Sequence, residues 1–138
     1  MDSQTVKCVL LADRHHGLTE GVRSLLETTF DTVVMVADET SLMKSAERLQ
    51  PTLAVVDLSL ARGDGLRWIK RLRSLCPDLK LILLSVHDEA SVCQTVLDAG
   101  ADGFVLKRAI ATELLSAIDM VLAGKHYASP AALGPPAK

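Results

Sequence analysis

The chain has 138 residues, of which 49% are hydrophobic, 23% charged and 3% aromatic, a composition typical of one globular domain with a substantial core. Its formal net charge of −2 and its pI near 6.0 argue against nucleic-acid binding by this segment, because such binding needs a basic surface. The longest apolar runs have only the length of strands, and residues 1–7 lack the pattern of a signal peptide, which argues against membrane insertion and secretion.

Short apolar runs rich in β-branched residues alternate along the chain with segments whose apolar residues recur at helical spacing. The first kind predicts strands buried on both faces of a sheet, and the second predicts amphipathic helices. The predicted strands cover residues 6–12, 32–37, 53–58, 79–85 and 103–106. The predicted helices cover residues 18–29, 40–49, the stretch between Gly65 and Pro77, 88–99 and 110–123.

Two helix ends carry specific signals. Thr40 or Ser41 is the predicted N-cap of the second helix, because a hydroxyl can accept hydrogen bonds from the free N–H groups of the first turn. That helix is expected to direct Leu42, Ala46 and Leu49 inward. Gly100 is the predicted C-cap of the fourth helix, since glycine readily adopts the left-handed conformation found there.

Strand and helix alternate five times, with neither an internal repeat nor a linker. Right-handed crossovers then predict a flavodoxin-like α/β fold: a doubly wound, five-stranded parallel sheet with strand order 2-1-3-4-5. We expect residues 1–124 to form this domain. The Pro- and Ala-rich residues 125–138 are expected to form a linker that leads out of it.

Chemically useful side chains follow the predicted strands. Asp13 and Arg14 follow the first strand, Asp57 ends the third, Ser85 ends the fourth, and Lys107 follows the fifth. Because the C-terminal ends of parallel strands share one edge, these side chains are expected to converge on Asp57. A carboxylate can accept a phosphoryl group as an acyl phosphate, and a hydroxyl, an ammonium and a divalent cation can bind the phosphoryl oxygens. The pattern therefore predicts phosphoryl chemistry.

Four segments carry a family resemblance. They read VLLADRHHGLTEGVRSLL, VVDLSLARGDGLRWIKRLR, LILLSVHDEASV and GADGFVLKRA. Over residues 6–121 the chain resembles the receiver domain of two-component response regulators. The segment GKHYASP further resembles the linker of NarL/FixJ-type regulators, in which a LuxR-type helix-turn-helix output domain follows. That output domain is expected beyond residue 138.

The resemblance assigns roles to the residues at the strand ends. Asp57 corresponds to the phospho-accepting aspartate, Ser85 to the switch hydroxyl, and Lys107 to the lysine that contacts the phosphoryl group. Phe104 corresponds to the aromatic rotamer switch, although a buried phenylalanine is also ordinary core. Asp13, Asp57 and the backbone carbonyl of Ser59 correspond to the Mg²⁺ ligands.

Two positions depart from the family pattern. Arg14 replaces the second acid of the metal site, so Asp13, Asp57, Arg14 and Lys107 sum to a neutral pocket. One unit charge at about 4 Å is worth roughly 4 kcal/mol at an effective dielectric constant of 20, so this replacement weakens Mg²⁺ binding unless Arg14 turns into solvent. Alternatively, the guanidinium pairs with Asp13 or Asp57 in place of the cation. Arg108 stands where many receivers have proline, and without proline a cis bond there costs about 2.5–4 kcal/mol.

The resemblance implies a signalling module rather than an enzyme. A sensor histidine kinase or phosphotransfer protein would phosphorylate Asp57, and phosphorylation would control homodimerisation and, through a separate output domain, DNA binding and transcription. A cytoplasmic location is expected, because the three cysteines match no metal spacing and cannot all pair. The alternative is a pseudo-receiver in which Arg14 holds Asp57 without metal and the domain serves as an interaction module. A flavodoxin-like hydrolase is disfavoured, because no nucleophile pair or Gly-rich phosphate loop is present.

Overall fold

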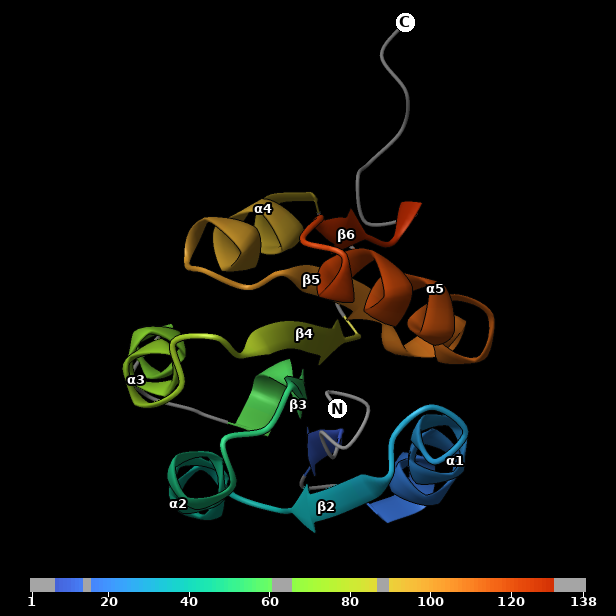
Figure 1. Cartoon of the computed structure of the whole chain (residues 1–138). Coiled ribbons are helices and arrows are strands. Elements are labelled where there is room, and N and C mark those ends of the chain that lie inside the picture. The colour runs from blue at the N-terminus through green and yellow to red at the C-terminus, as the bar shows by residue number, and fades with distance from the viewer. Residues whose placement is uncertain (1–6, 14–15, 61–65, 87–89, 131–138) are drawn as a thin grey trace, which may run out of the picture.

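The protein folds as a parallel sheet covered by helices on both faces, as a computed structural model shows (Figure 1). The structure describes residues 7–13, 16–60, 66–86 and 90–130. The strands are β1 (Cys8–Ala12), β2 (Thr32–Val36), β3 (Leu53–Asp57), β4 (Lys80–Ser85), β5 (Gly103–Leu106) and β6 (Tyr127–Ala128). The helices are α1 (His16–Leu26), α2 (Glu39–Leu49), α3 (Arg67–Leu75), α4 (Ala90–Asp98) and α5 (Ile110–Leu122), with short 3₁₀ turns at η2 (Leu58–Leu60) and η3 (Lys107–Ala109).

The strand order is β2-β1-β3-β4-β5-β6, and every pairing is parallel. The predicted order of the first five strands is confirmed. The sixth strand was not predicted: residues 127–128 fall in the expected linker, yet they pair with β5. Two residues are too few to show a strand pattern in sequence, so only their contact with β5 makes them a strand.

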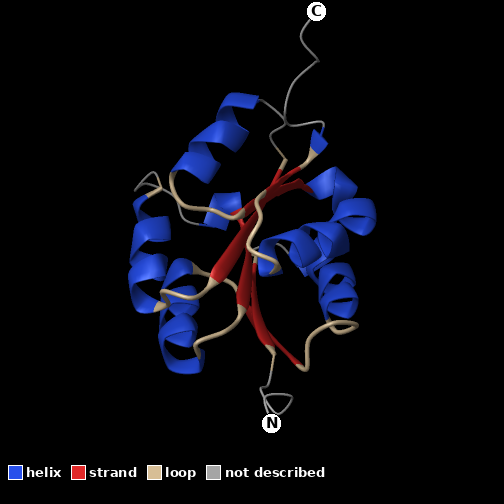
Figure 2. Cartoon of the chain, turned by 45° about the horizontal axis from the view of Figure 1, so that its top comes forward, coloured by secondary structure: helices blue, strands red, loops and turns tan. Residues whose placement is uncertain are grey.

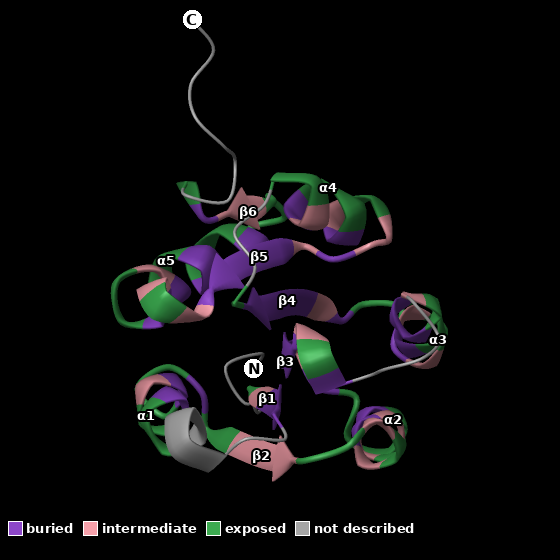
Figure 3. Cartoon of the chain, turned by 180° about the vertical axis from the view of Figure 1, so that it is seen from behind, coloured by how far each residue is buried: buried purple, intermediate pink, exposed green. Residues whose placement is uncertain are grey.

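The sheet separates two hydrophobic layers, visible as helices on either side of the strands (Figure 2). Alternate residues of each strand face opposite layers: Val9 of β1 packs with α1 and α5, whereas Leu10 packs with α2, α3 and α4. The strands β3, β4 and β5 are almost wholly buried, while β2 and β6 are half-buried (Figure 3). Asp57, Ser85 and Lys107 therefore lie at the ends of the most buried strands.

Several local predictions need correction. The N-cap of α2 is Asp38, whose carboxylate accepts from the N–H of Ser41 at 2.7 Å, so the cap lies before Thr40. Leu49 is 36% exposed rather than inward, and it is the last residue of α2. Helix α1 ends at Leu26, since the N–H groups of Thr28 and Thr29 close tight i→i−3 turns instead of continuing the helix.

Two glycines have conformations or contacts that a side chain would disturb. Gly100 has φ of +121° after α4, in line with the predicted cap. At Gly103 a Cβ atom would lie 3.0 Å from Ile82 Cγ1 and 3.3 Å from Val121 Cγ1. A glycine at the start of β5 therefore lets α5 pack closely against the sheet.

Among the residues that the structure describes, no helix combines the length and the apolar character needed to cross a bilayer.

Candidate functional site

The C-terminal edge of the sheet brings an acidic and a basic group together. Asp13 follows β1, Asp57 ends β3, and Lys107 follows β5 at the start of η3. Lys107 Nζ lies 2.8 Å from Asp57 Oδ2 and 3.9 Å from Asp13 Oδ2. The side chains of Asp57 and Asp13 are only 3% and 2% exposed, and that of Lys107 is 16% exposed. The structure thus places three of the predicted site residues in one buried cluster.

Lys107 reaches this position because β5 and β3 run parallel, with β4 between them. The 3₁₀ turn η3 follows directly and leads into α5. No cis peptide bond occurs in the described residues, so the bond between Lys107 and Arg108 is trans. This is the form that a residue other than proline favours, and the lysine still reaches Asp57.

The carboxylate of Asp57 is held by groups on several sides. Its Oδ1 accepts from the backbone N–H of Ser59 at 3.1 Å, and its Oδ2 accepts from Lys107. Burial raises the pKa of Asp57, but the hydrogen bonds from Lys107 and the Ser59 N–H, together with the charge of Lys107, help to bring the pKa below its ordinary value. Asp57 is therefore ionised near neutral pH, the form in which a carboxylate acts as a nucleophile.

The Ser59 N–H was not among the predicted site groups. It is a backbone contact made where the chain turns from β3 into η2, and its side chain is exposed. A carboxylate directly before such a turn often accepts from the N–H two residues later, so an acid followed by a turn is the sequence signal for this contact.

Ser85 ends β4 and is 1% exposed. In the strand register, Ser85 lies opposite Leu106, one residue before Lys107. Its neighbour Leu84 lies opposite Asp57. The hydroxyl-bearing residue is therefore on the strand between Asp57 and Lys107, as predicted. Phe104 is fully buried and packs in the layer below α2, α3 and α4. Its core role is evident, and its role as a rotamer switch stays a prediction.

The oxygen donors at this edge fit a magnesium ion. Mg²⁺ binds proteins through one or two carboxylates, with water and phosphate oxygens completing its octahedron. Asp13 and Asp57 supply two buried carboxylates, and the carbonyl of Ser59 follows Asp57 closely in the chain. In the described parts of the chain, no three side chains of His, Cys, Asp or Glu form a metal-binding group, so waters and a phosphate would have to supply the remaining ligands.

The predicted effect of Arg14 on this site cannot be read from the geometry, because Arg14 lies outside the described residues. His15 and His87, which border the strand ends in the sequence, also lie outside the described residues. Competition between the Arg14 guanidinium and a metal ion therefore stays a prediction from the sequence.

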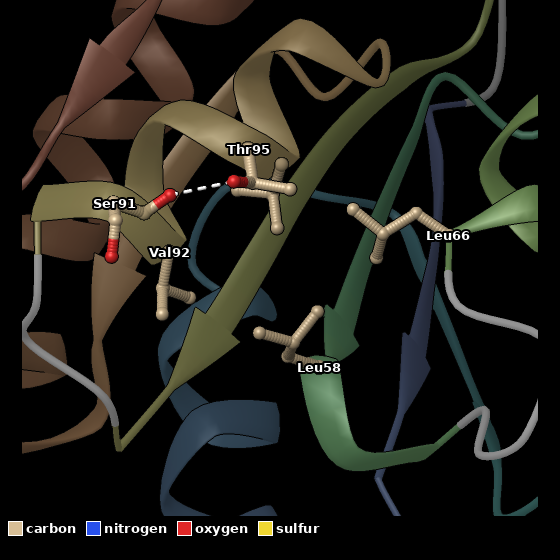
Figure 4. A pocket seen from close by; sticks show the side chains of 6 residues that line it. Leu58, Leu66, Ser91, Val92 and Thr95 are labelled. Carbon is tan, nitrogen blue, oxygen red and sulfur yellow. Dashed lines mark hydrogen bonds between the residues drawn. The ribbon is translucent and has the colours of Figure 1, made fainter.

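A cavity of about 350 Å³ lies beside the site, between η2 and the first turns of α4. Leu58, which directly follows Asp57, faces Val92 across it, and Leu66 and Thr95 contribute further walls (Figure 4). The Thr95 hydroxyl donates to the Ser91 carbonyl at 2.7 Å, so it is already paired within α4. The cavity is thus mainly apolar, in contrast with the charged cluster next to it.

Comparison with known proteins agrees with this geometry. The family model of the response regulator receiver domain matches residues 9–119. The transcriptional regulatory protein DegU of Brevibacillus brevis is 30% identical over 124 residues, covering 88% of this chain and 52% of the relative. The transcriptional regulatory protein RcsB of Escherichia coli K12 is 30% identical over 124 residues, covering 86% of this chain and 57% of the relative. The chain spans about half the length of the curated relatives that it matches.

Solved structures give the same result. The isolated receiver domain of RcsB from Salmonella enterica serovar Typhimurium, with the phosphomimetic BeF₃⁻, superposes with a TM-score of 0.79 at 27% identity, covering 93% of this chain and 96% of that one. RcsB from the same organism, bound to the promoter P1flhDC in the presence of BeF₃⁻, gives a TM-score of 0.76 at 28% identity, covering 93% and 65%. These relatives are NarL/LuxR-family response regulators. The chain therefore belongs to the response regulator receiver domain family.

Proposed function

We propose that this receiver domain accepts a phosphoryl group on Asp57 from the phosphohistidine of a histidine kinase or phosphotransfer protein in the cytoplasm. The observation that carries the proposal is the buried Asp57 carboxylate, ionised and held between Lys107 Nζ at 2.8 Å and the Ser59 N–H at 3.1 Å. In the transfer, a carboxylate oxygen forms a bond to phosphorus, the phosphorus–nitrogen bond breaks, and the imidazole nitrogen keeps the electron pair.

The neighbouring residues have defined tasks in this reaction. Lys107 is close enough to exchange the carboxylate for an oxygen of the transferred group, which develops negative charge. Ser85 at the end of β4 would hydrogen-bond a second oxygen, and Phe104 would adjust to that movement. Mg²⁺, held by Asp13, Asp57 and the Ser59 carbonyl, would supply additional positive charge when bound.

The test is phosphorylation by a small phosphodonor, followed by intact-protein mass spectrometry, with and without Mg²⁺. We expect the wild-type protein to gain the mass of one phosphoryl group and Asp57→Asn to gain none. The matched control is Asp102→Asn, because Asp102 is a carboxylate at the opposite edge of the sheet. Its modification should equal that of the wild type. Absence of an Asp57-dependent mass gain under both conditions would contradict the proposal.

A larger protein would use this modification for transcriptional control. The RcsB structure bound to a promoter supports DNA binding by the larger protein, through the output domain expected beyond residue 138. Homodimerisation would connect the two events. Sedimentation of the full-length regulator with and without BeF₃⁻ tests this step.

A second function, a pseudo-receiver that acts as a constitutive interaction module, is favoured by Arg14 alone. In that case the guanidinium would hold Asp57 without metal, and regulation would come from a protein partner. Arg14→Asp should then create Mg²⁺ binding that the wild type lacks, measured by calorimetric titration. Equal Mg²⁺ affinity of the two proteins would count against the pseudo-receiver.

A further inference from the structure

The strand β6 extends the sheet beyond β5. The N–H of Tyr127 donates to the Asp102 carbonyl at 3.0 Å, and the N–H of Ser129 donates to the Phe104 carbonyl at 2.9 Å. In Figure 1, β6 lies at the outer edge of β5, between α4 and α5. Because the pairing is parallel, the chain leaves β6 at the same edge of the sheet that carries Asp57 and Lys107.

Ser129 ends this pairing with its side chain. The residue is fully buried, and its hydroxyl oxygen accepts from the N–H of Leu106 at 3.0 Å. Parallel pairing spaces its hydrogen bonds evenly, so the next acceptor in the ladder would be the carbonyl of Ser129. The hydroxyl takes this place and satisfies the last donor of β5. Alanine at position 129 would leave that buried N–H without its acceptor.

Glu113 of α5 fixes the hydroxyl in turn. Its Oε1 accepts from the Ser129 hydroxyl at 2.6 Å and from the Tyr127 hydroxyl at 2.9 Å. We call Glu113, Tyr127 and Ser129 the tail clamp. The clamp ties three elements together. Glu113 belongs to α5, Tyr127 and Ser129 belong to the tail, and the hydroxyl oxygen of Ser129 accepts a hydrogen bond from β5.

The clamp is one residue from the reactive lysine. Leu106, whose N–H the clamp holds, directly precedes Lys107, whose Nζ is 2.8 Å from Asp57. At its other end β6 begins opposite Asp102, and the carboxylate of Asp102 forms an ion pair with Arg73. The tail therefore spans from a fixed point at one edge of the sheet to the backbone that carries Lys107 at the other.

We propose that Ser129 is a positioning residue for Lys107, and that the tail clamp makes docking of the tail and phosphorylation of Asp57 support each other. This rests on the proposed function of Asp57. A docked tail holds the backbone at Leu106 and thereby directs Lys107 at the phosphoryl oxygens. By linkage, a phosphoryl group that engages Lys107 stabilises the docked tail to the same extent. The clamp thus carries the phosphorylation signal into the segment that leads out of the domain.

Hydrogen exchange in the wild-type protein tests the coupling without any change to the clamp. Binding of BeF₃⁻ with Mg²⁺ should slow the exchange of the Leu106 and Ser129 amides by about fivefold or more, the lower end of ordinary allosteric coupling. Asp57→Asn, without any ligand, should speed the same exchange, because Lys107 loses its nearest carboxylate. The amides of β2 serve as the internal reference, since β2 pairs only with β1 and carries none of the site residues.

Substitution of the clamp tests the reverse direction. Ser129→Ala should weaken BeF₃⁻ binding by about fivefold or more, and it should move the pKa of Asp57 up toward the ordinary value as Lys107 loosens. Tyr127→Phe removes one hydrogen bond to Glu113 but keeps the contact between Ser129 and Leu106, so its effect should be smaller. Ser116→Ala is the matched control, because Ser116 is an exposed serine of α5.

The outcomes separate this proposal from the proposed function. If Ser129→Ala lowers stability but leaves both the BeF₃⁻ affinity and the pKa of Asp57 unchanged, Ser129 is only structural and the proposal is wrong. If the wild type binds no BeF₃⁻, the proposed function is contradicted, and the response of the tail amides to Asp57→Asn decides the coupling by itself. Unchanged exchange in Asp57→Asn and with BeF₃⁻ bound would overturn the coupling even if Asp57 is phosphorylated.

Discussion

At one edge of the sheet Arg73 of α3 meets Asp102, and at the other edge Lys107 meets Asp57. The guanidinium of Arg73 donates to the carbonyls of Gly100 and Leu79 as well as to the Asp102 carboxylate. Asp102 Oδ2 also accepts from the N–H of Leu81 at 2.9 Å. The planar fork of arginine is thus used to join α3 to the backbone at the start of β4 and β5.

The pair at the other edge serves a different purpose. Lysine carries a compact charge on a flexible stem, and Lys107 lies near two carboxylates rather than among backbone carbonyls. An ammonium in this setting can exchange one anionic oxygen for another. The comparison teaches that two ion pairs in one sheet can differ in function: the arginine pair fixes the fold, and under the proposed function the lysine pair binds a phosphoryl group.

Removing the arginine should have the largest effect. Arg73→Ala leaves the Asp102 carboxylate and two carbonyls without their donor, so we expect the free energy of unfolding to fall by about 3 kcal/mol. Urea denaturation measures this change. The control is Arg71→Ala, because Arg71 of the same helix pairs with Glu39 of α2 at the surface and its side chain is 52% exposed. That variant should lose less than about 1 kcal/mol, and equal losses would contradict the comparison.

Neutralising the two acids gives the next contrast. Asp102→Asn removes the charged partner of Arg73, and we expect a loss of about 1–2 kcal/mol of unfolding free energy. Asp57→Asn removes the cost of burying a charge, which stabilises the fold, and it also removes the bond to Lys107, which destabilises it. These effects offset each other, so the free energy of unfolding should change by less than about 1 kcal/mol. Thermal unfolding of both variants checks the prediction. If Asp57→Asn proves the more destabilising, the lysine pair also fixes the fold.

Tyr127 lies on the strand that connects the two edges, and it is the single tyrosine of the chain. Burial, the hydrogen bond to Glu113 and the charge of Glu113 raise its pKa to about 12. Since this pKa is raised, the stabilisation that protonated Tyr127 gives the fold is complete at pH values below its ordinary pKa of 10.0. It is lost as the pH rises through about 12. Glu113→Gln should lower the pKa toward the ordinary value in an ultraviolet titration. Asp119→Asn, on an exposed part of the same helix, should leave it unchanged.

The smallest effect is expected in acid. The pKa of Asp57 is lowered, so its contribution to stability is present above the ordinary carboxylate pKa and is lost as the pH falls through the lowered value. Stability of the wild type should therefore decrease more steeply at low pH than that of Asp57→Asn, as measured by denaturation across the acid range. Parallel curves for the two proteins would show that Asp57 gains no stabilisation from Lys107.

Much of the site followed from the sequence, because its residues stand at the ends of strongly patterned strands. Asp13, Asp57, Ser85 and Lys107 lie at the predicted edge, and parallel strands require that their ends meet there. The roles of these side chains and the effect of Arg14 stay predictions. The Ser59 N–H was missed, because a sequence pattern indicates which side chain ends a strand but not which backbone group turns toward it.

The basic residues of α3 show a second limit. In the sequence they form one basic run, and Arg67, Lys70 and Arg71 are exposed. Arg73 instead turns toward the start of β5 and joins it to α3. Helical spacing cannot distinguish these cases, since the acceptors of Arg73 at Gly100 and Asp102 are 27 and 29 residues away in the chain.

The sequence by itself determined the alternation of strands and helices, their order in the sheet and the edge at which the acids and the lysine meet. Its repeating patterns are local, and the rules of parallel connection leave little choice once these patterns are set. Only the tertiary structure decided that residues 127–129 extend the sheet at the edge of β5, and that Ser129 and Tyr127 share one oxygen of Glu113. Those contacts join segments without a periodic pattern, so a buried serine that holds β5 looks in sequence like any serine in a linker.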